Sequence, residues 1–284
     1  MISKEYSFHA PKKLDEALTL LAHHGDDAKV LSGGMSLVPV MTLGLVQPEV
    51  VVSLNHIPGL DYVKEEGSTV RIGALTRHEK IRSDPLVQRS FALLSQAAAF
   101  IGDVQVRHRG TIGGSLAHAD PAADYLPVML VLGAQFRLQS AKGERIVKAS
   151  DFFKGLMQTL LQPAELLTEV QIPKLKDGAG SSYQRLHRVE GNFAIVSAAA
   201  VVEKGFAAAR IALGGVGPKP VLIDVTHRLT KGLSDDALRG MSDDAFDASH
   251  EAYGDLNGDS DYRRAMARVY AQRVIRAAAA AARS

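Results

Sequence analysis

The most informative part of the sequence is RGTIGGSLAHADPAAD, residues 109–124, and LSGGMSL, residues 31–37, has similar chemistry. In each segment a Gly-Gly pair, Gly33–Gly34 or Gly113–Gly114, comes just before a small hydroxyl residue. Glycine lets a backbone turn sharply and approach a ligand closely, and successive N–H groups with Ser or Thr hydroxyls can hold phosphate oxygens. Two ordinary tight turns are the alternative. A single short motif of this kind is more often an ordinary turn than a phosphate site. The presence of two such segments makes the preference for ordinary turns weaker but does not reverse it.

Neither segment is a common nucleotide-binding motif. G-x-G-x-x-G is absent, which excludes a Rossmann fingerprint, and no Gly-Lys-Ser/Thr follows, which excludes a Walker loop. A dinucleotide bound here would therefore require a different fold. A third cluster, Gly214–Pro218 (GGVGP), precedes no predicted helix, and we interpret it as a plain connection.

Asp120 and Asp124 flank the predicted start of a helix. From spacing alone, capping of that helix is the favoured role, because Asp is a leading N-cap residue. The alternative is that these carboxylates accept hydrogen bonds from ligand hydroxyls, such as those of a ribose or ribityl chain.

The pattern of apolar residues predicts an opening β-α-β-like unit, a central region of mixed elements and a different C-terminal region. In the opening we expect a helix around Leu14–Leu21, a short apolar segment Lys29–Leu31, a helix over Leu37–Leu45 and a strand over Val50–Leu54. In the centre we expect strands over Thr69–Ala74, Gln135–Gln139 and Leu166–Ile172, one long helix from Asp84 to Ile101, and a helix from Asp120–Asp124 to Leu132. Beyond a linker at Lys174–Ser182 we expect a hairpin of Phe193–Glu203 with Ala207–Leu213, then helices ending in Asp261–Ala282.

Composition excludes several classes of protein. The 284 residues include 33 Lys and Arg against 31 Asp and Glu, a balance too even to indicate nucleic acid or a charged membrane as partner. No cysteine is present, so the chain cannot itself ligate an iron–sulfur cluster or use a thiol nucleophile. The ten histidines show no metal-binding spacing. With no apolar leader and no stretch of about 20 apolar residues, we expect a cytoplasmic protein without a transmembrane segment.

Six segments together resemble a known family. They are LSGGMSLVPVMTLGLVQPEVVVSLNHIPGL (31–60), IGALTRHEKI (72–81), IGDVQVRHRGTIGGSLAHADPAADYLPVMLVLGA (101–134), YQRLHRVEGNFAIVSAAA (183–200), IALGGVGPKPV (211–221) and DYRRAMARVYAQRVIRAA (261–278). In this order they are similar to the FAD-binding medium subunit of molybdenum hydroxylases, of the carbon monoxide dehydrogenase and xanthine dehydrogenase type. The resemblance extends over nearly the whole chain.

This resemblance implies an α+β fold with two domains. Residues 1–175 would form an FAD-binding domain of the vanillyl-alcohol-oxidase (PCMH) type, with α/β subdomains 1–57 and 58–175. Residues 176–284 would form a smaller α+β C-terminal domain.

The resemblance also implies which residues bind FAD, and no residue of the chain is implied to be catalytic or to bind metal. The pyrophosphate would be held by Ser32, Gly33, Gly34, Met35, Ser36 and Leu37 together with Thr111, Gly113, Gly114 and Ser115. Asp120 and Asp124 would contact the flavin's hydroxylated chain or adjoining groups, which reverses the preference for capping. Ile101 and Leu167 would pack near the adenine or neighbouring parts, and Arg185 and Phe193 would complete the site.

Three positions depart from the usual family pattern. Met35 stands where a polar Gln or His is common, and Asn192 stands where the family usually has Asp. Phe193 stands where many members of the family have Tyr. Since that aromatic ring can lie close to the isoalloxazine, the missing hydroxyl would remove a hydrogen bond near the flavin.

The function implied is electron transfer within a complex. A large molybdenum-cofactor subunit would oxidise the substrate, a small subunit with [2Fe–2S] clusters would pass electrons to FAD, and the assembly would be a dimer of heterotrimers. NAD, quinone and dioxygen remain open as acceptors. A self-contained flavin-dependent oxidase or dehydrogenase of the same fold is the alternative, and a non-enzymatic subunit that has lost flavin is a third hypothesis.

Overall fold

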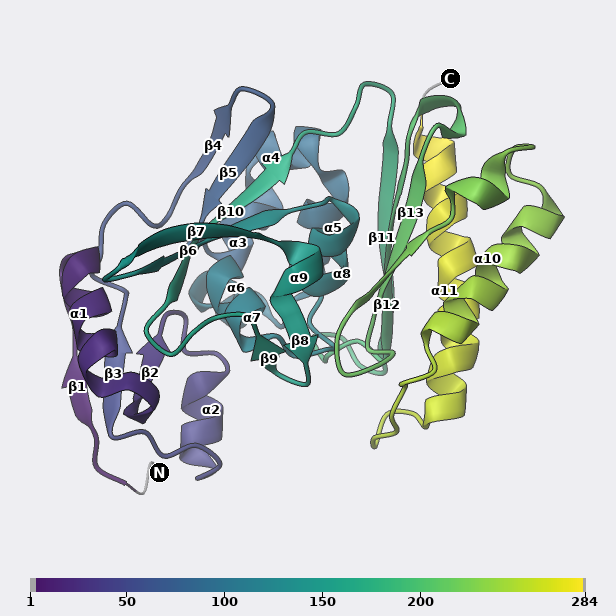
Figure 1. The fold of residues 1–284 in the computed structure, drawn as a ribbon. Helices are drawn as coiled ribbons and strands as arrows, with labels where there is room; N and C mark the ends of the chain where they lie inside the picture. The colour runs from purple at the N-terminus through teal and green to yellow at the C-terminus, as the bar shows by residue number, and fades with distance from the viewer. Residues whose placement is uncertain (1–3, 283–284) are drawn as a thin grey trace.

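Three of the four β-sheets formed by the described residues lie side by side, with helices between and around them (Figure 1). This computed structural model describes residues 4–282. The outermost residues of the two predicted domains, 1–3 and 283–284, lie outside the described part.

The first sheet contains the predicted β-α-β-like unit and one strand that was not predicted, β1 (Ser7–His9). Its strands are parallel and lie in the order β1-β3-β2. The elements are β1 (Ser7–His9), α1 (Leu14–His24), the 3₁₀ turn η1 (Gly25–Asp27), β2 (Ala28–Leu31), α2 (Leu37–Thr42) and β3 (Val50–Ser53). Every residue of β3 is buried, because β3 is the central strand and α1 packs on it. The polar residues that follow β2 and β3 therefore emerge at the same edge of this sheet.

The second sheet is antiparallel, in the order β4-β5-β10-β6-β7. Its strands are β4 (Val63–Glu66), β5 (Thr69–Gly73), β6 (Gln135–Ser140), β7 (Gly143–Lys148) and β10 (Leu166–Pro173); β8 (Phe153–Gly155) and β9 (Gln158–Thr159) form a separate hairpin. The accompanying helices are α3 (His78–Ser83), α4 (Pro85–Ser90), α5 (Ala92–Phe100), α6 (Val104–Arg109), α7 (Ile112–His118), α8 (Tyr125–Val131) and α9 (Ala149–Phe152). Alternate strand residues such as Val70, Ile72 and Val170 are wholly buried beneath these helices in the largest apolar core.

Three expectations for local structure are corrected. The single helix from Asp84 to Ile101 is two helices, α4 and α5, because Phe91 leaves helical geometry (φ −146°, ψ 66°) and buries its ring completely. The second glycine segment is only partly a loop, since Gly113 and Gly114 lie in the first turn of α7. The linker is shorter than Lys174–Ser182, because the next strand already begins at Gly180.

The third sheet is antiparallel and lies between two helical layers (Figure 1). It consists of β11 (Gly180–Leu186), β12 (Val196–Val202), β13 (Ala209–Gly214) and β14 (Val221–Asp224), with 3₁₀ turns η2 (Lys204–Phe206) and η3 (Thr226–Leu229). Helix α11 (Ser260–Ala281) covers one face, with α10 (Asp235–Ala248) packed on α11, and α5 and α8 of the preceding region cover the other. All seven residues of β12 are buried for this reason. The predicted hairpin and terminal helix are confirmed.

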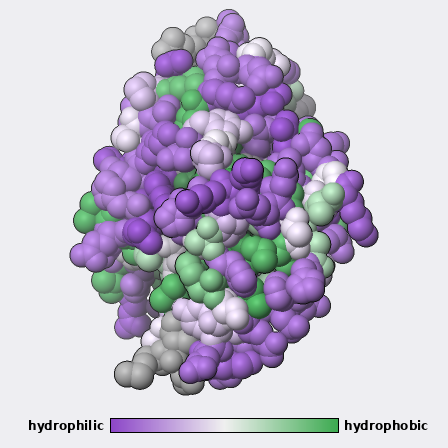
Figure 2. All heavy atoms as spheres, turned by 90° about the vertical axis from the view of Figure 1, so that its left-hand side faces the viewer, coloured by the Kyte–Doolittle hydropathy of each residue, from purple (hydrophilic) through white to green (hydrophobic). Residues whose placement is uncertain are grey.

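The surface on the side of β1 and α1 is mainly hydrophilic, with a group of apolar residues in its lower half (Figure 2). Among the described residues, none of the helices combines the length and the apolar character that crossing a membrane requires.

Candidate functional site

The two glycine segments meet although 79 positions separate Ser32 from Thr111. The hydroxyls of Ser32 and Thr111 share a hydrogen bond of 3.1 Å. A Cβ atom on Gly33 would lie 2.4 Å from the carbonyl oxygen of Arg109, and one on Gly114 would lie 2.7 Å from the Ser32 hydroxyl. Only glycine permits this approach, so the pairs form a cradle of two backbone segments rather than two independent turns.

The two sides of the cradle offer different groups to a ligand. In the second segment the amides of Ile112 and Gly113 donate to the carbonyls of Thr76 and Ala74, and the amide of Gly114 donates to the Thr111 hydroxyl at 3.1 Å. In the first segment, within residues 4–282, the amides of Gly33–Met35 have no hydrogen-bond acceptor. Free N–H groups are what an anion requires. The first segment therefore supplies backbone donors, and the second supplies close approach and hydroxyls.

Two residues that we did not predict from the sequence hold the segments together. Asn55 follows β3 and donates to the Ser32 carbonyl at 2.9 Å. Arg77 precedes α3 and donates both to the Asn55 side-chain oxygen at 3.0 Å and to the Arg109 carbonyl. Asn55 could have been found as a polar residue at the carboxyl end of a buried strand, whereas nothing in the sequence marks Arg77 as its partner.

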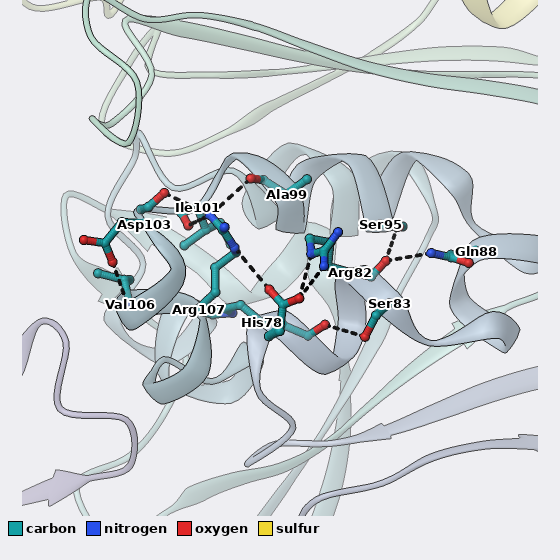
Figure 3. Close-up of polar contacts among 12 residues, drawn as sticks. His78, Arg82, Ser83, Gln88, Ser95, Ala99, Ile101, Asp103, Val106 and Arg107 are labelled. Atoms are coloured by element: carbon teal, nitrogen blue, oxygen red, sulfur yellow. Dashed lines mark hydrogen bonds and ion pairs between the residues drawn. The ribbon is translucent and has the colours of Figure 1, made fainter.

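The turn that contains Ile101 is fixed by a second arginine. Arg107 donates to the carbonyls of Ile101 and Gly102 at 3.2 and 3.1 Å, and its Nε donates to Glu79 at 3.2 Å. Arg82 approaches the same carboxylate from the other side (Figure 3). These two guanidinium groups lower the pKa of Glu79, and it is the hydrogen bond from Arg82 that lowers it most. The carboxylate therefore stays ionised and anchors Arg107 against the turn.

A buried histidine, His78, packs against Gly110 beside the second glycine segment. His78 contacts the Tyr125 hydroxyl at 3.1 Å through Nδ1, and a Cβ on Gly110 would lie 2.5 Å from its Nε2. Burial lowers the pKa of His78 to about 3, and the charges of Arg77 and Arg107 act in the same direction. At neutral pH the ring is therefore uncharged.

Asp124 is not a helix cap. Although it lies at the N-cap position of α8, its side chain accepts no hydrogen bond from that helix. Its carboxylate instead accepts hydrogen bonds from Arg185 at 3.1 and 3.2 Å and from the Tyr183 hydroxyl, both on β11. Burial raises the pKa of Asp124, and the ion pair with Arg185 opposes that effect. The pair joins the central region to the C-terminal sheet.

Asp120 is half-buried and accepts a hydrogen bond from the Ala122 amide at 2.8 Å, which closes a turn rather than capping α8. This turn contacts the C-terminal sheet, because the Gly215 amide donates to the Pro121 carbonyl at 2.8 Å. Phe193 lies on the loop between β11 and β12 and is 59% exposed. A Cβ on Gly191 would lie 3.6 Å from Gly102, so this loop lies against the turn that contains Ile101.

The remaining predicted residues differ in exposure. Met35 is exposed, Ser36 and Leu37 are half-buried at the start of α2, and Ser115 is half-buried in α7. Leu167 belongs to the largest apolar core, and Ile101 packs against that core. Within residues 4–282, no group of three or more His, Asp or Glu side chains is arranged to hold a metal ion.

Comparison with known proteins identifies the fold and the family. Residues 4–175 match the family described as FAD binding domain in molybdopterin dehydrogenase, and residues 181–278 match the CO dehydrogenase flavoprotein C-terminal domain. The chain belongs to the molybdenum hydroxylase flavoprotein family. The predicted resemblance, the α+β fold with its PCMH-type FAD domain, and the FAD-binding character of the chain are thereby confirmed.

Two relatives and one solved structure match this flavoprotein over nearly its whole length. The carbon monoxide dehydrogenase medium chain of Hydrogenophaga pseudoflava is 40% identical, with 98% of each chain covered. The 6-hydroxypseudooxynicotine dehydrogenase complex subunit alpha of Paenarthrobacter nicotinovorans is 35% identical, with coverage of 95% and 93%. A solved carbon monoxide dehydrogenase from H. pseudoflava matches with a TM-score of 0.94 over 100% of each chain at 40% identity.

Proposed function

We propose that this chain is the FAD-carrying electron-transfer subunit of a molybdenum-containing dehydrogenase complex. It would act between [2Fe–2S] clusters of a small partner subunit and an external electron acceptor, with a large partner subunit carrying the molybdenum cofactor. The observation that carries the proposal is the cradle of two glycine segments in a chain that matches an FAD-binding domain over residues 4–175. FAD would supply the exchange of one or two electrons, a chemistry that no side chain of this protein provides.

The residues of the cradle fit a pyrophosphate. Donors of the kind that bind phosphate oxygens are the hydroxyls of Ser32 and Thr111 and the amides of Gly33–Met35, which have no acceptor in the part of the chain that the structure describes. Burial and the nearby charge of Arg109 lower the pKa of Arg77, and a bound anion would offset the repulsion between these two cations.

The other predicted residues would position the rest of the cofactor. Asp120 would accept hydrogen bonds from ribityl or ribose hydroxyls, and Phe193 would lie against the flavin ring. The buried Asp124–Arg185 pair would stabilise the structure beneath the bound cofactor. Leu167 and Ile101 would provide apolar contacts near the adenine.

Partner subunits follow from the composition of the chain. No cysteine is present to ligate an iron–sulfur cluster, so an iron–sulfur electron donor would lie on another chain. Several relatives are described as a medium chain or as a subunit of a complex, which supports a large and a small partner, and we propose a dimer of heterotrimers.

The test is to purify the complex from its native host and to measure flavin, iron and molybdenum. We expect one FAD per copy of this chain, released by denaturation, with iron and molybdenum in the partner subunits after separation. Reduction of FAD by substrate only when both partners are present would support transfer between subunits. A complex without flavin would refute the proposal, and substrate turnover by the isolated chain would favour a self-contained oxidase.

A further inference from the structure

Arg263 is a buried cation at the start of α11, outside the glycine cradle and the residues that hold it together. It is 2% exposed, and its Nη1 donates to two backbone carbonyls, those of Ile195 and, at 2.9 Å, Gly215. Its Nη2 pairs with Asp255 at 2.7 Å, and its Nε donates to the Gly258 carbonyl at 3.4 Å. One guanidinium group therefore joins three loops that are distant in sequence.

The two carbonyls belong to the segments that border the proposed flavin site. Ile195 comes two residues after Phe193. Gly215 has its carbonyl bound to Arg263 and its amide bound to the Pro121 carbonyl, beside Asp120. Arg263 thus connects the loop that contains Phe193 to the turn that contains Asp120.

Gly215 can be replaced by no larger residue without disturbing the contacts of Arg263 and Ile195. Gly215 has a left-handed backbone (φ 74°), and a Cβ there would lie 2.5 Å from the Ile195 carbonyl oxygen and 3.4 Å from Nη1 of Arg263. The cluster Gly214–Pro218, predicted to be a plain connection, is therefore part of a junction between the two domains.

We propose that Arg263 is a positioning residue for the flavin, which sets the placement of Phe193 relative to the turn that contains Asp120. It touches neither cofactor nor substrate and acts through the two carbonyls that it binds. A planar guanidinium suits this role because its fork of donors can bind several acceptors at once, which the single ammonium of a lysine does less well. The proposal rests on the proposed function, since it requires that flavin binds between these two segments.

The test compares Arg263→Gln, Arg263→Lys and the milder Asp255→Asn with a matched control, Arg228→Gln. Arg228 is also in the C-terminal domain and pairs with Asp244 at 2.7 Å, but it does not contact the junction. Hydrogen exchange of the Gly215 amide is measured in the full chain without flavin. The flavin midpoint potential and visible spectrum are measured in the complex with its partner subunits, and denaturant midpoints report the stability of every variant.

We expect the Gly215 amide to exchange roughly tenfold faster or more in Arg263→Gln, because hydrogen bonds to a charged donor are lost. The flavin potential and spectrum should shift in this variant, less so in Arg263→Lys and Asp255→Asn, and not in Arg228→Gln. If Arg263→Gln does not fold, Arg263→Lys and Asp255→Asn carry the same comparison.

Two results would overturn the proposal. One is unchanged Gly215 exchange in every folded variant of Arg263 and Asp255, which would mean that no such connection exists. The other is faster exchange with an unaltered flavin potential and spectrum, which would leave Arg263 a purely structural residue. A wild-type complex without flavin would instead refute the proposed function, so the two failures are distinguishable.

Discussion

Replacing Gly33 by alanine should weaken FAD binding by pushing the two sides of the cradle apart. A Cβ at this position would lie 2.4 Å from the Arg109 carbonyl oxygen and 2.7 Å from the Cα of Gly110, where ordinary contact begins at 3.4 Å. Both neighbours are backbone atoms that cannot rotate away, so the segments must separate by about 1 Å in a region of close packing. The backbone of Gly33 itself is not left-handed, so the alanine adds crowding without backbone strain.

Crowding of this kind typically costs about 1–3 kcal/mol, which corresponds to roughly 5- to 150-fold in affinity if it falls on the bound state. The assay is titration of the flavin-free full chain with FAD, followed by the quenching of flavin fluorescence, with thermal unfolding measured in parallel. Gly155→Ala is the matched control, because a Cβ there meets nothing closer than 3.4 Å, at the end of the Gln158 side chain. Wild-type affinity in a folded Gly33→Ala protein, or an equal loss in Gly155→Ala, would refute the reasoning.

Three further predictions concern the side chains around the cradle. Asn55→Ala removes the donor to the Ser32 carbonyl and should weaken FAD binding by about 1 kcal/mol, roughly fivefold, in the same titration; unchanged affinity would exclude a role for this tie. His78→Asn should make the protein less sensitive to acid. The folded ring has a pKa of about 3 against a usual 6.5, so the unfolded chain takes up the proton first and wild-type stability falls as pH decreases below 6.5, by about 2 kcal/mol at pH 5. Urea unfolding at pH 7 and 5 should show that loss in wild type but not in the variant, and equal losses would contradict it. Arg107→Gln should remove the hydrogen bond to the Ile101 carbonyl and increase amide hydrogen exchange in that turn by roughly tenfold. Unchanged exchange would show that the turn is stable without Arg107.

Elements with strong local signals were predictable, and interruptions caused by packing were not. The opening β-α-β unit and the terminal helix have clear apolar periodicity, and the structure contains both. The break at Phe91 is different, because no Gly or Pro marks it. It arises because the ring is buried in the core, and that gain is visible only once the helices are packed. The complete burial of β12 likewise depends on helices from both domains.

The aspartates show the limit of reasoning from spacing. Asp120 and Asp124 stand where capping residues stand, and spacing alone favoured that role. The partner that changes the interpretation of Asp124 is Arg185, 61 positions away and on β11 of the C-terminal sheet. Local sequence could indicate that a carboxylate was present near the helix, but only tertiary structure could supply its buried cation.

The three glycine clusters show that a Gly-Gly motif predicts a close approach to the backbone but does not predict which atoms make that approach. Gly33 has no side chain because the backbone of the second segment occupies that space, and its own amide has no acceptor among the described residues 4–282. Gly113 has no side chain because Ala74, which directly follows β5, occupies that space: a Cβ on Gly113 would lie 2.5 Å from the Ala74 Cβ. Gly215 is glycine for a further reason, a left-handed backbone held between two domains. The Gly-Gly pattern is shared by all three, so only the identity of the opposing atoms distinguishes a ligand cradle from helix packing and from a domain junction. Substitution to alanine should therefore give different defects, with FAD affinity lost most at Gly33 and the contact between domains lost most at Gly215.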